Sequence, residues 1–126
     1  MFENIKRGVY QIGDKSIYFR SEWEFKYAVY LEFLKKNKEI FDWKYEPKEF
    51  FFETIKKGTR FYTPDFQVFQ TADKYEWHEV KGYMTSKAQT QINRFRKYFP
   101  KEKHIIIDNE FFKAIKRRGM DKLLSW

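Results

Sequence analysis

Cysteine is absent from the 126 residues of this sequence. Its absence excludes a disulfide framework, a thiolate zinc site and a catalytic thiol. Any metal ion would therefore have to be bound by oxygen atoms or by the two histidines, His78 and His104.

Long apolar runs are missing as well, and no stretch is long enough to span a bilayer. Residues 1–8 carry Glu3, Lys6 and Arg7 where a signal peptide would have its apolar core. We therefore expect an intracellular, cytoplasmic and soluble protein. Glycine and proline occur only 5 and 3 times, and no linker or repeat is evident, so we expect one domain over residues 1–126.

Aromatic and basic side chains are abundant instead. Aromatic residues make up 22% of the chain and hydrophobic residues 42%, which is far too much bulky apolar material for a disordered chain. The 26 Lys and Arg outnumber the 18 Asp and Glu and give a net charge of +8. This charge favours a nucleic-acid partner, although an ordinary basic surface would produce the same balance.

Hydrophobic periodicity indicates the first elements. Residues 9–12 and 16–19 flank a turn sequence and predict a hairpin. Helical spacing of apolar residues predicts a helix over residues 22–36, and Ser21 with Glu24 forms a capping-box pattern at its start. Five β-type segments follow and suggest an antiparallel meander, at residues 42–45, 49–55, 60–63, 66–69 and 75–81.

The remaining elements predict the fold class. A second helix runs from Thr85 or Ser86 to about Phe99, and residues 104–108 read as a buried strand that joins the sheet in parallel through a crossover. A basic helix over residues 110–118 follows. The order of helix, antiparallel strands, helix, parallel strand and helix predicts an α/β sandwich around a mixed β-sheet.

Two short acidic motifs carry the candidate chemistry. Asp65 follows Pro64 at the expected start of a strand, where proline is tolerated because the ladder need not continue through it. After thirteen further residues come Glu79 and Lys81, which share a face because side chains alternate along a strand. They could be an ordinary surface pair, but bulky residues on both faces of this strand predict that it is covered, and charges there usually need a partner or a metal.

Phosphodiester cleavage suits these residue types. It needs an activated water and neutralisation of the charge that grows on the phosphate, which Mg²⁺ or Mn²⁺ can supply. Such cations prefer carboxylate oxygens and keep several waters, so converging Asp65 and Glu79 would provide suitable ligands. Lys81 could orient the attacking water, accept its proton or stabilise the developing charge, and the residues do not choose among these roles.

The spacing of Pro64-Asp65 and Glu79-Val80-Lys81 resembles the signature of the PD-(D/E)XK nuclease superfamily. Within it, residues 20–24, 43–47 and 79–84 are most similar to small phage-encoded endonucleases and Holliday junction resolvases, and transposon-end endonucleases are also similar. The resemblance implies a restriction-endonuclease-like sandwich and a metal-dependent endodeoxyribonuclease, encoded by a phage or bacterium. For a four-way junction, a homodimer would supply the two symmetric cuts.

The same resemblance implies roles for single residues. Asp65 would bridge the metal, Glu79 and the Val80 carbonyl would ligate it, and Lys81 would serve the nucleophile. Glu24 would complete the metal shell, but its place in the capping box explains it equally well. Glu46 is a reserve candidate for a further metal or water ligand, and an acid ahead of a proline in an extended segment is also commonplace.

Basic residues near the motifs are candidates for contacts with DNA phosphates. Arg20 and Arg60 are candidates because we expect them to lie beside the site. One face of the second helix could track the backbone, or could simply be solvated, and it carries Lys87, Gln91, Arg94 and Lys97. Two alternatives remain open: a sequence- or partner-directed nuclease, and a non-catalytic DNA-binding module.

Overall fold

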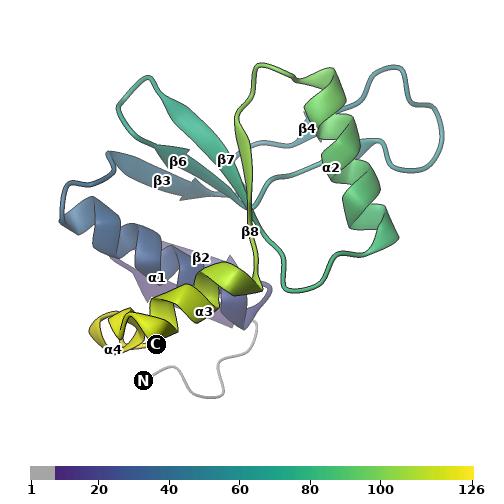
Figure 1. Ribbon diagram of the computed structural model, residues 1–126. Coiled ribbons are helices and arrows are strands. Elements are labelled where there is room, and N and C mark those ends of the chain that lie inside the picture. The colour runs from purple at the N-terminus through teal and green to yellow at the C-terminus, as the bar shows by residue number, and fades with distance from the viewer. Residues whose placement is uncertain (1–7) are drawn as a thin grey trace.

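The computed structural model describes residues 8–126. Its main feature is a mixed β-sheet (Figure 1). Its strand order is β3 (Asp42–Tyr45), β6 (Phe66–Phe69), β7 (Tyr75–Val80) and β8 (His104–Ile107). The pairs β3–β6 and β6–β7 are antiparallel, whereas β8 runs parallel to β7. The predicted mixed α/β class and the parallel last strand are therefore confirmed.

Residues 1–7, for which we expected no signal-peptide core, lie outside the described part of the chain. Within residues 8–126, no helix is both long enough and apolar enough to cross a bilayer.

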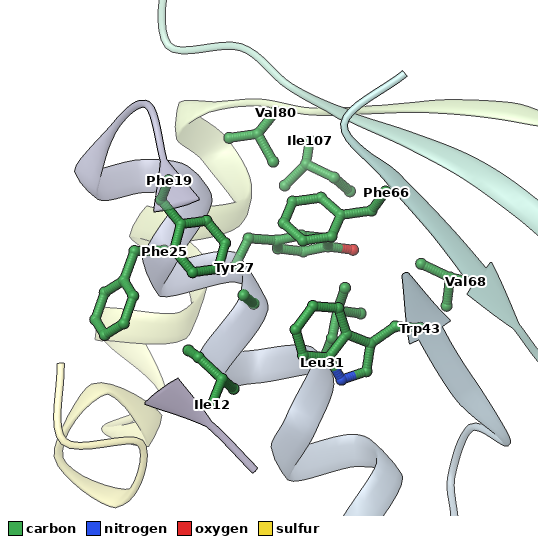
Figure 2. Close-up of a cluster of buried hydrophobic side chains, with 11 residues drawn as sticks. Ile12, Phe19, Phe25, Tyr27, Leu31, Trp43, Phe66, Val68, Val80 and Ile107 are labelled. Atoms are coloured by element: carbon green, nitrogen blue, oxygen red, sulfur yellow. The ribbon is translucent and has the colours of Figure 1, made fainter. Parts of the chain in front are cut away.

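The sheet is covered on both faces. One face packs against α1 (Glu22–Lys36), the hairpin of β1 (Gly8–Ile12) and β2 (Lys15–Phe19), and α3 (Asn109–Arg117). Figure 2 shows this core, in which Phe66, Val80 and Ile107 of the sheet meet Tyr27 and Leu31 of α1.

The other face packs against α2 (Ser86–Tyr98). There the cluster combines Trp77 of β7 with Ile92 and Phe95 of α2, and all three side chains are buried. The alternation along β7 explains the division, because Trp77 and Glu79 face α2 while His78 and Val80 face α1. Glu79 is thus carried by a strand with a packed core on each side.

The turn of the hairpin is tied to α1 by a buried carboxylate. Gly13 has a φ of 59°, and a Cβ there would lie 2.3 Å from Glu32 Oε2. Glu32 Oε1 in turn accepts a 2.9 Å hydrogen bond from Trp43 Nε1 in β3. Glycine is therefore needed both for the left-handed turn and for the close approach of Glu32.

The helices begin and end close to the predicted residues. Helix α1 has the predicted bounds, and Thr85 caps α2 by accepting a hydrogen bond from Ala88 N–H. Helix α3 begins at Asn109, one residue earlier than predicted, because Asp108 is its N-cap. A short helix, α4 (Met120–Leu123), follows near the end of the chain.

The prediction of a continuous antiparallel meander is wrong. The strands β4 (Phe50–Phe51) and β5 (Phe61–Tyr62) pair with each other in a separate two-stranded sheet and do not join the main one. Their inward residues Phe50 and Tyr62 pack with Phe95 of α2, so apolar burial is satisfied without a place in the main sheet.

The prediction of a fully buried last strand is also wrong in part. In β8 only Ile107 is buried, and the other three residues are half-buried. The reason is its position at the edge of the sheet, where β7 is its neighbour.

Candidate active site

Asp65 and Glu79 face each other at the point where the pairing of β6 and β7 ends. The register pairs Phe66 with His78, and continuing it by one residue places Asp65 opposite Glu79. Here side chains replace the backbone ladder: Val80 N–H donates to Asp65 Oδ2 at 2.8 Å, and Asp65 N–H donates to Glu79 Oε1 at 3.3 Å. The two acids are therefore locked together by their own strands.

Both carboxyl groups are buried, with exposed fractions of 5% for Asp65 and 4% for Glu79. Burial raises the pKa of Asp65 well above its usual value, and the charges of Glu79 and Glu24 raise it further. Burial also raises the pKa of Glu79, although the hydrogen bond from Tyr62 and the nearby Lys81 oppose this shift. A buried pair of acids that disfavour each other's charge is an environment suited to a cation.

Lys81 lies just beyond β7 on the same face as Glu79, as the two-residue spacing predicts. Its Nζ is 3.3 Å from Glu79 Oε2, and its side chain is half-buried. Its backbone N–H donates to the Ile107 carbonyl at 2.9 Å, which extends the pairing with β8 past the end of β7. The ammonium group is thus held beside the acidic pair by the sheet itself.

The backbone and the side chain of Glu24 make different contacts. Its backbone N–H donates to Ser21 Oγ at 3.2 Å, which confirms Ser21 as the N-cap of α1. Its carboxylate does not close the predicted capping box, because Oε1 accepts a hydrogen bond from Tyr45 Oη instead. The side chain therefore points toward the acidic pair, whose Asp65 pKa it raises.

These groups line one open cavity of about 490 Å³. Glu46 joins them, because its N–H donates to the Asp65 carbonyl at 2.8 Å and its carboxylate pairs with Arg20. A left-handed backbone at Glu46, with φ of 47°, accompanies this position. The complete lining is Arg20, Glu24, Glu46, Phe61, Tyr62, Thr63, Asp65, Glu79, Lys81 and Gln91.

Tyr62 is a site residue that the sequence did not reveal. Its hydroxyl donates to Glu79 Oε1 at 2.6 Å and lies 2.8 Å from His104 Nε2. Arg96 Nε donates to His104 Nδ1 at 3.2 Å. Since an arginine can only donate, the neutral ring must carry its proton on Nε2 and donate it to Tyr62. Hydrogen bonds therefore run in one direction from Arg96 to Glu79.

Burial, together with the charge of Arg96, lowers the pKa of His104 to about 4, so the ring is neutral near pH 7. His78 lies on the other face of the sheet. Its Nδ1 lies 2.6 Å from Tyr27 Oη and its Nε2 lies 2.8 Å from Glu76 Oε1. His78 is thus held by two hydrogen-bond partners away from the site, while His104 contacts the site through Tyr62.

The predicted DNA-contacting residues are distributed unevenly. Arg20 and Gln91 line the site cavity, and Arg60 and Lys87 line an adjoining cavity of about 400 Å³ that shares Phe61 and Gln91 with it. Arg94 lines neither cavity, but its guanidinium donates to the carbonyl of Thr59, which lines the adjoining one, and Lys97 is exposed elsewhere on α2.

The site offers a pair of acids for a metal ion and not a closed cage. Within residues 8–126, no three Asp, Glu or His side chains come close enough to form a ready metal-binding group. Asp65 uses Oδ2 for its bond to Val80, so Oδ1 is the oxygen that remains for a cation. Since Mg²⁺ is usually held by one or two carboxylates together with waters and substrate phosphates, this donor set fits it.

The structure thus defines a mixed α/β protein with a buried acidic pair and a lysine in one polar cavity. A family described as "Protein of unknown function (DUF1064)" matches residues 5–114, and the chain belongs to this family. The match includes the whole cavity lining from Arg20 to Gln91. No curated protein and no solved structure matches the chain.

Proposed function

We propose that the chain is a metal-dependent endodeoxyribonuclease that hydrolyses DNA phosphodiester bonds, with a restriction-endonuclease-like sandwich of the PD-(D/E)XK type. The observation that carries the proposal is the interlocked pair of Asp65 and Glu79, with Lys81 Nζ 3.3 Å from Glu79. Their spacing in the sequence resembles the signature of that superfamily, and their burial at the end of paired strands is a costly arrangement for a protein that needs no charge there.

The residues that would hold Mg²⁺ or Mn²⁺ are Asp65, Glu79, Glu24 and the Val80 carbonyl. When bound, the ion would activate water and neutralise charge on the phosphate. Asp65 and Glu79 are positioned for this purpose by hydrogen bonds between β6 and β7. The Tyr45 hydroxyl holds Glu24 toward the same cavity.

Lys81 contributes a donor beside the acids. Because Glu79 Oε2 anchors its ammonium group, Lys81 is suited to orient an attacking water and to stabilise charge on the phosphate. Tyr62 contacts the other carboxylate oxygen of Glu79 by donating a 2.6 Å hydrogen bond to Oε1. Together the two contacts restrict the Glu79 carboxylate to one orientation.

Cations around the cavity suit DNA phosphates. Arg20 lies at the site cavity, and Arg60 and Lys87 lie at the adjoining one, so a strand crossing both would meet positive charge beside the acids. Gln91 lies between the two cavities and offers a neutral donor. The net charge of +8 adds a long-range attraction to the same partner.

The preferred substrate in this proposal is branched DNA, as in Holliday junction resolution, and the protein acts as a homodimer. A four-way junction requires two symmetric cuts, and a two-fold dimer supplies one site for each. The test incubates the full chain and Mg²⁺ with a four-way junction, a linear duplex and a single strand of the same sequence. We expect paired symmetric nicks in the junction, and equal cutting of the linear duplex would contradict junction resolution.

A further inference from the structure

The outer face of the β4–β5 sheet carries two exposed phenylalanines. Phe51 and Phe61 are direct partners in the strand register, and their ring centroids are 4.8 Å apart. Each side chain remains 42% exposed. The two rings form an aromatic surface beside the proposed active site, and no part of residues 8–126 covers it fully.

The alternation of side chains explains why these two rings point outward. Phe50 and Tyr62, their neighbours in sequence, are buried with Phe95 of α2. The inward residues therefore attach the hairpin to α2, and the outward pair adds nothing to that core. Figure 1 shows the β4 segment running beside α2.

The aromatic pair is continuous with the site. Phe61 lines both the site cavity and the adjoining cavity, and Gln91 Nε2 fixes its backbone by donating to the Phe61 carbonyl at 3.0 Å. The carboxylates of Asp65 and Glu79 lie in the first of these cavities. A ligand that occupied both cavities would therefore contact Phe61.

Positive charge accompanies the rings. The Arg60 guanidinium lies 5.7 Å from the Phe51 centroid and 5.8 Å from the Phe61 centroid. Lys87 lines the adjoining cavity with Arg60, and among the described residues that lining contains no acidic side chain. An aromatic surface bordered by cations matches a nucleotide, whose base is flat and whose phosphate is anionic.

We infer that Phe51 and Phe61 form a stacking platform for an unpaired base next to the cleaved phosphate, while Arg60 and Lys87 bind the phosphates of that nucleotide. The inference rests on the proposed function and adds that the branched substrate presents an unpaired base beside the cut when it is bound. In a fully paired duplex the faces of the bases are stacked on one another, so the platform would have nothing to bind.

The test measures binding of the full chain by fluorescence anisotropy in EDTA, so that it does not depend on cleavage. The ligands are a fully paired duplex and a duplex of equal length with splayed, unpaired arms. The variants are Phe61→Leu and the double change of Phe51 and Phe61 to Leu, which keep apolar character, and Phe61→Trp, which keeps an aromatic face. Phe41→Leu is the matched control. Phe41 is also an exposed phenylalanine, at 57%, but it lies beside Phe69, at the end of the β3–β6 pair that is away from Asp65.

We expect the wild type to bind the splayed ligand at least about fivefold more tightly than the duplex, and the leucine variants to lose this preference. Phe61→Trp should retain it, as should Phe41→Leu. Equal binding of both ligands by the wild type would overturn the inference, and so would an undiminished preference in the double variant or an equal loss in the control.

A change of oligomeric state in the leucine variants, measured by light scattering, would also overturn the inference, because it would assign the platform to contacts between copies of the chain. Cleavage in Mg²⁺ is scored separately on the same ligands. Binding preference without cleavage would contradict the proposed nuclease and leave the platform supported, whereas cleavage without preference would do the reverse.

Discussion

Asp65 and Lys81 line the same cavity and would act there through different chemistry. Asp65→Asn keeps the shape of the side chain and an oxygen for Val80 N–H, but it removes the charge that a cation would need. Lys81→Ala removes the ammonium group beside Glu79. Because Arg20, Arg60 and Lys87 remain in both variants, we expect each variant to lose cleavage by at least about 100-fold while DNA binding stays within about threefold.

The measurement is single-turnover cleavage beside equilibrium binding on one labelled junction. Near wild-type rates in either variant would remove that residue from the proposed mechanism.

Tyr62 donates a hydrogen bond to Glu79, and we propose that it positions Glu79 without contacting substrate itself. Tyr62→Phe removes the 2.6 Å hydrogen bond to Glu79 and leaves His104 Nε2 without its acceptor. Loss of such a supporting contact typically costs about 10- to 100-fold in metal affinity or activity. We expect that reduction in cleavage and a higher Mg²⁺ concentration for half-maximal rate.

Tyr98→Phe is the matched control, since its hydroxyl contacts Thr54 on the same side of the sheet and not the acids. Equal losses in the two tyrosine variants would show that Tyr62 acts only through general stability.

His104 makes the stability of the fold depend on pH. Its pKa is lowered to about 4 in the folded protein, below the ordinary value of 6.5, so the unfolded chain binds the proton first as pH falls. The stabilisation is therefore complete above about pH 6.5 and is lost toward pH 4. Allowing for partial exposure of the ring, it should amount to roughly 1–2 kcal/mol.

Urea unfolding of the wild type and of His104→Gln at pH 7.5 and 4.5 measures this difference. The variant should lose less stability between the two pH values than the wild type. Identical losses would contradict the lowered pKa.

At the scale of elements, two substitutions at the start of α1 distinguish its N-cap from the proposed catalytic role of Glu24. Ser21→Ala removes the hydrogen bond to Glu24 N–H and should lower the free energy of unfolding by about 1 kcal/mol. Glu24→Gln keeps this cap and can keep the contact with Tyr45, but it removes the charge in the cavity. We expect Glu24→Gln to reduce cleavage at near wild-type stability, and Ser21→Ala to do the opposite.

Thermal unfolding and cleavage rates of both variants provide the comparison. If Ser21→Ala reduced cleavage as much as Glu24→Gln, the capping role would account for Glu24.

Local periodicity predicted the elements that bury one regular face. Helices α1 and α2 and strands β6 and β7 have nearly the predicted bounds, because their apolar residues recur at regular intervals along the chain. The same rule failed for β4 and β5, whose aromatic residues are apolar enough for a strand in the main sheet but pack against α2 instead. Packing against α2 depends on residues about 40 positions away in the sequence, so the local sequence does not reveal it.

The site was predictable only where a short motif carries it. Asp65, Glu79 and Lys81 could be named because strand alternation and register bring them together. Tyr62 and His104 could not, because the hydrogen bonds that link them to Glu79 join residues 17 and 42 positions apart. For Glu24, the capping pattern is satisfied by Ser21 alone, so the direction of the carboxylate required the structure.

At the scale of the whole molecule, the buried acids and the outermost cations of the two cavities lie on different elements. Asp65 and Glu79 are buried where the pairing of β6 and β7 ends, whereas Arg60 and Lys87 are exposed beside β5 and on α2. A rigid sheet therefore holds the proposed catalytic groups, and outer elements present the groups that would bind the DNA backbone.

The most direct test of the central claim is the metal dependence of strand cleavage by the purified full chain. A labelled four-way junction is incubated with Mg²⁺, with Mn²⁺ and with EDTA, and Asp65→Asn purified in parallel controls for contaminating nucleases. We expect strand cleavage by the wild type with either metal, and none with EDTA or with the variant. Cleavage that persists in EDTA, or no cleavage by the wild type with either metal while the junction is bound, would contradict the central claim.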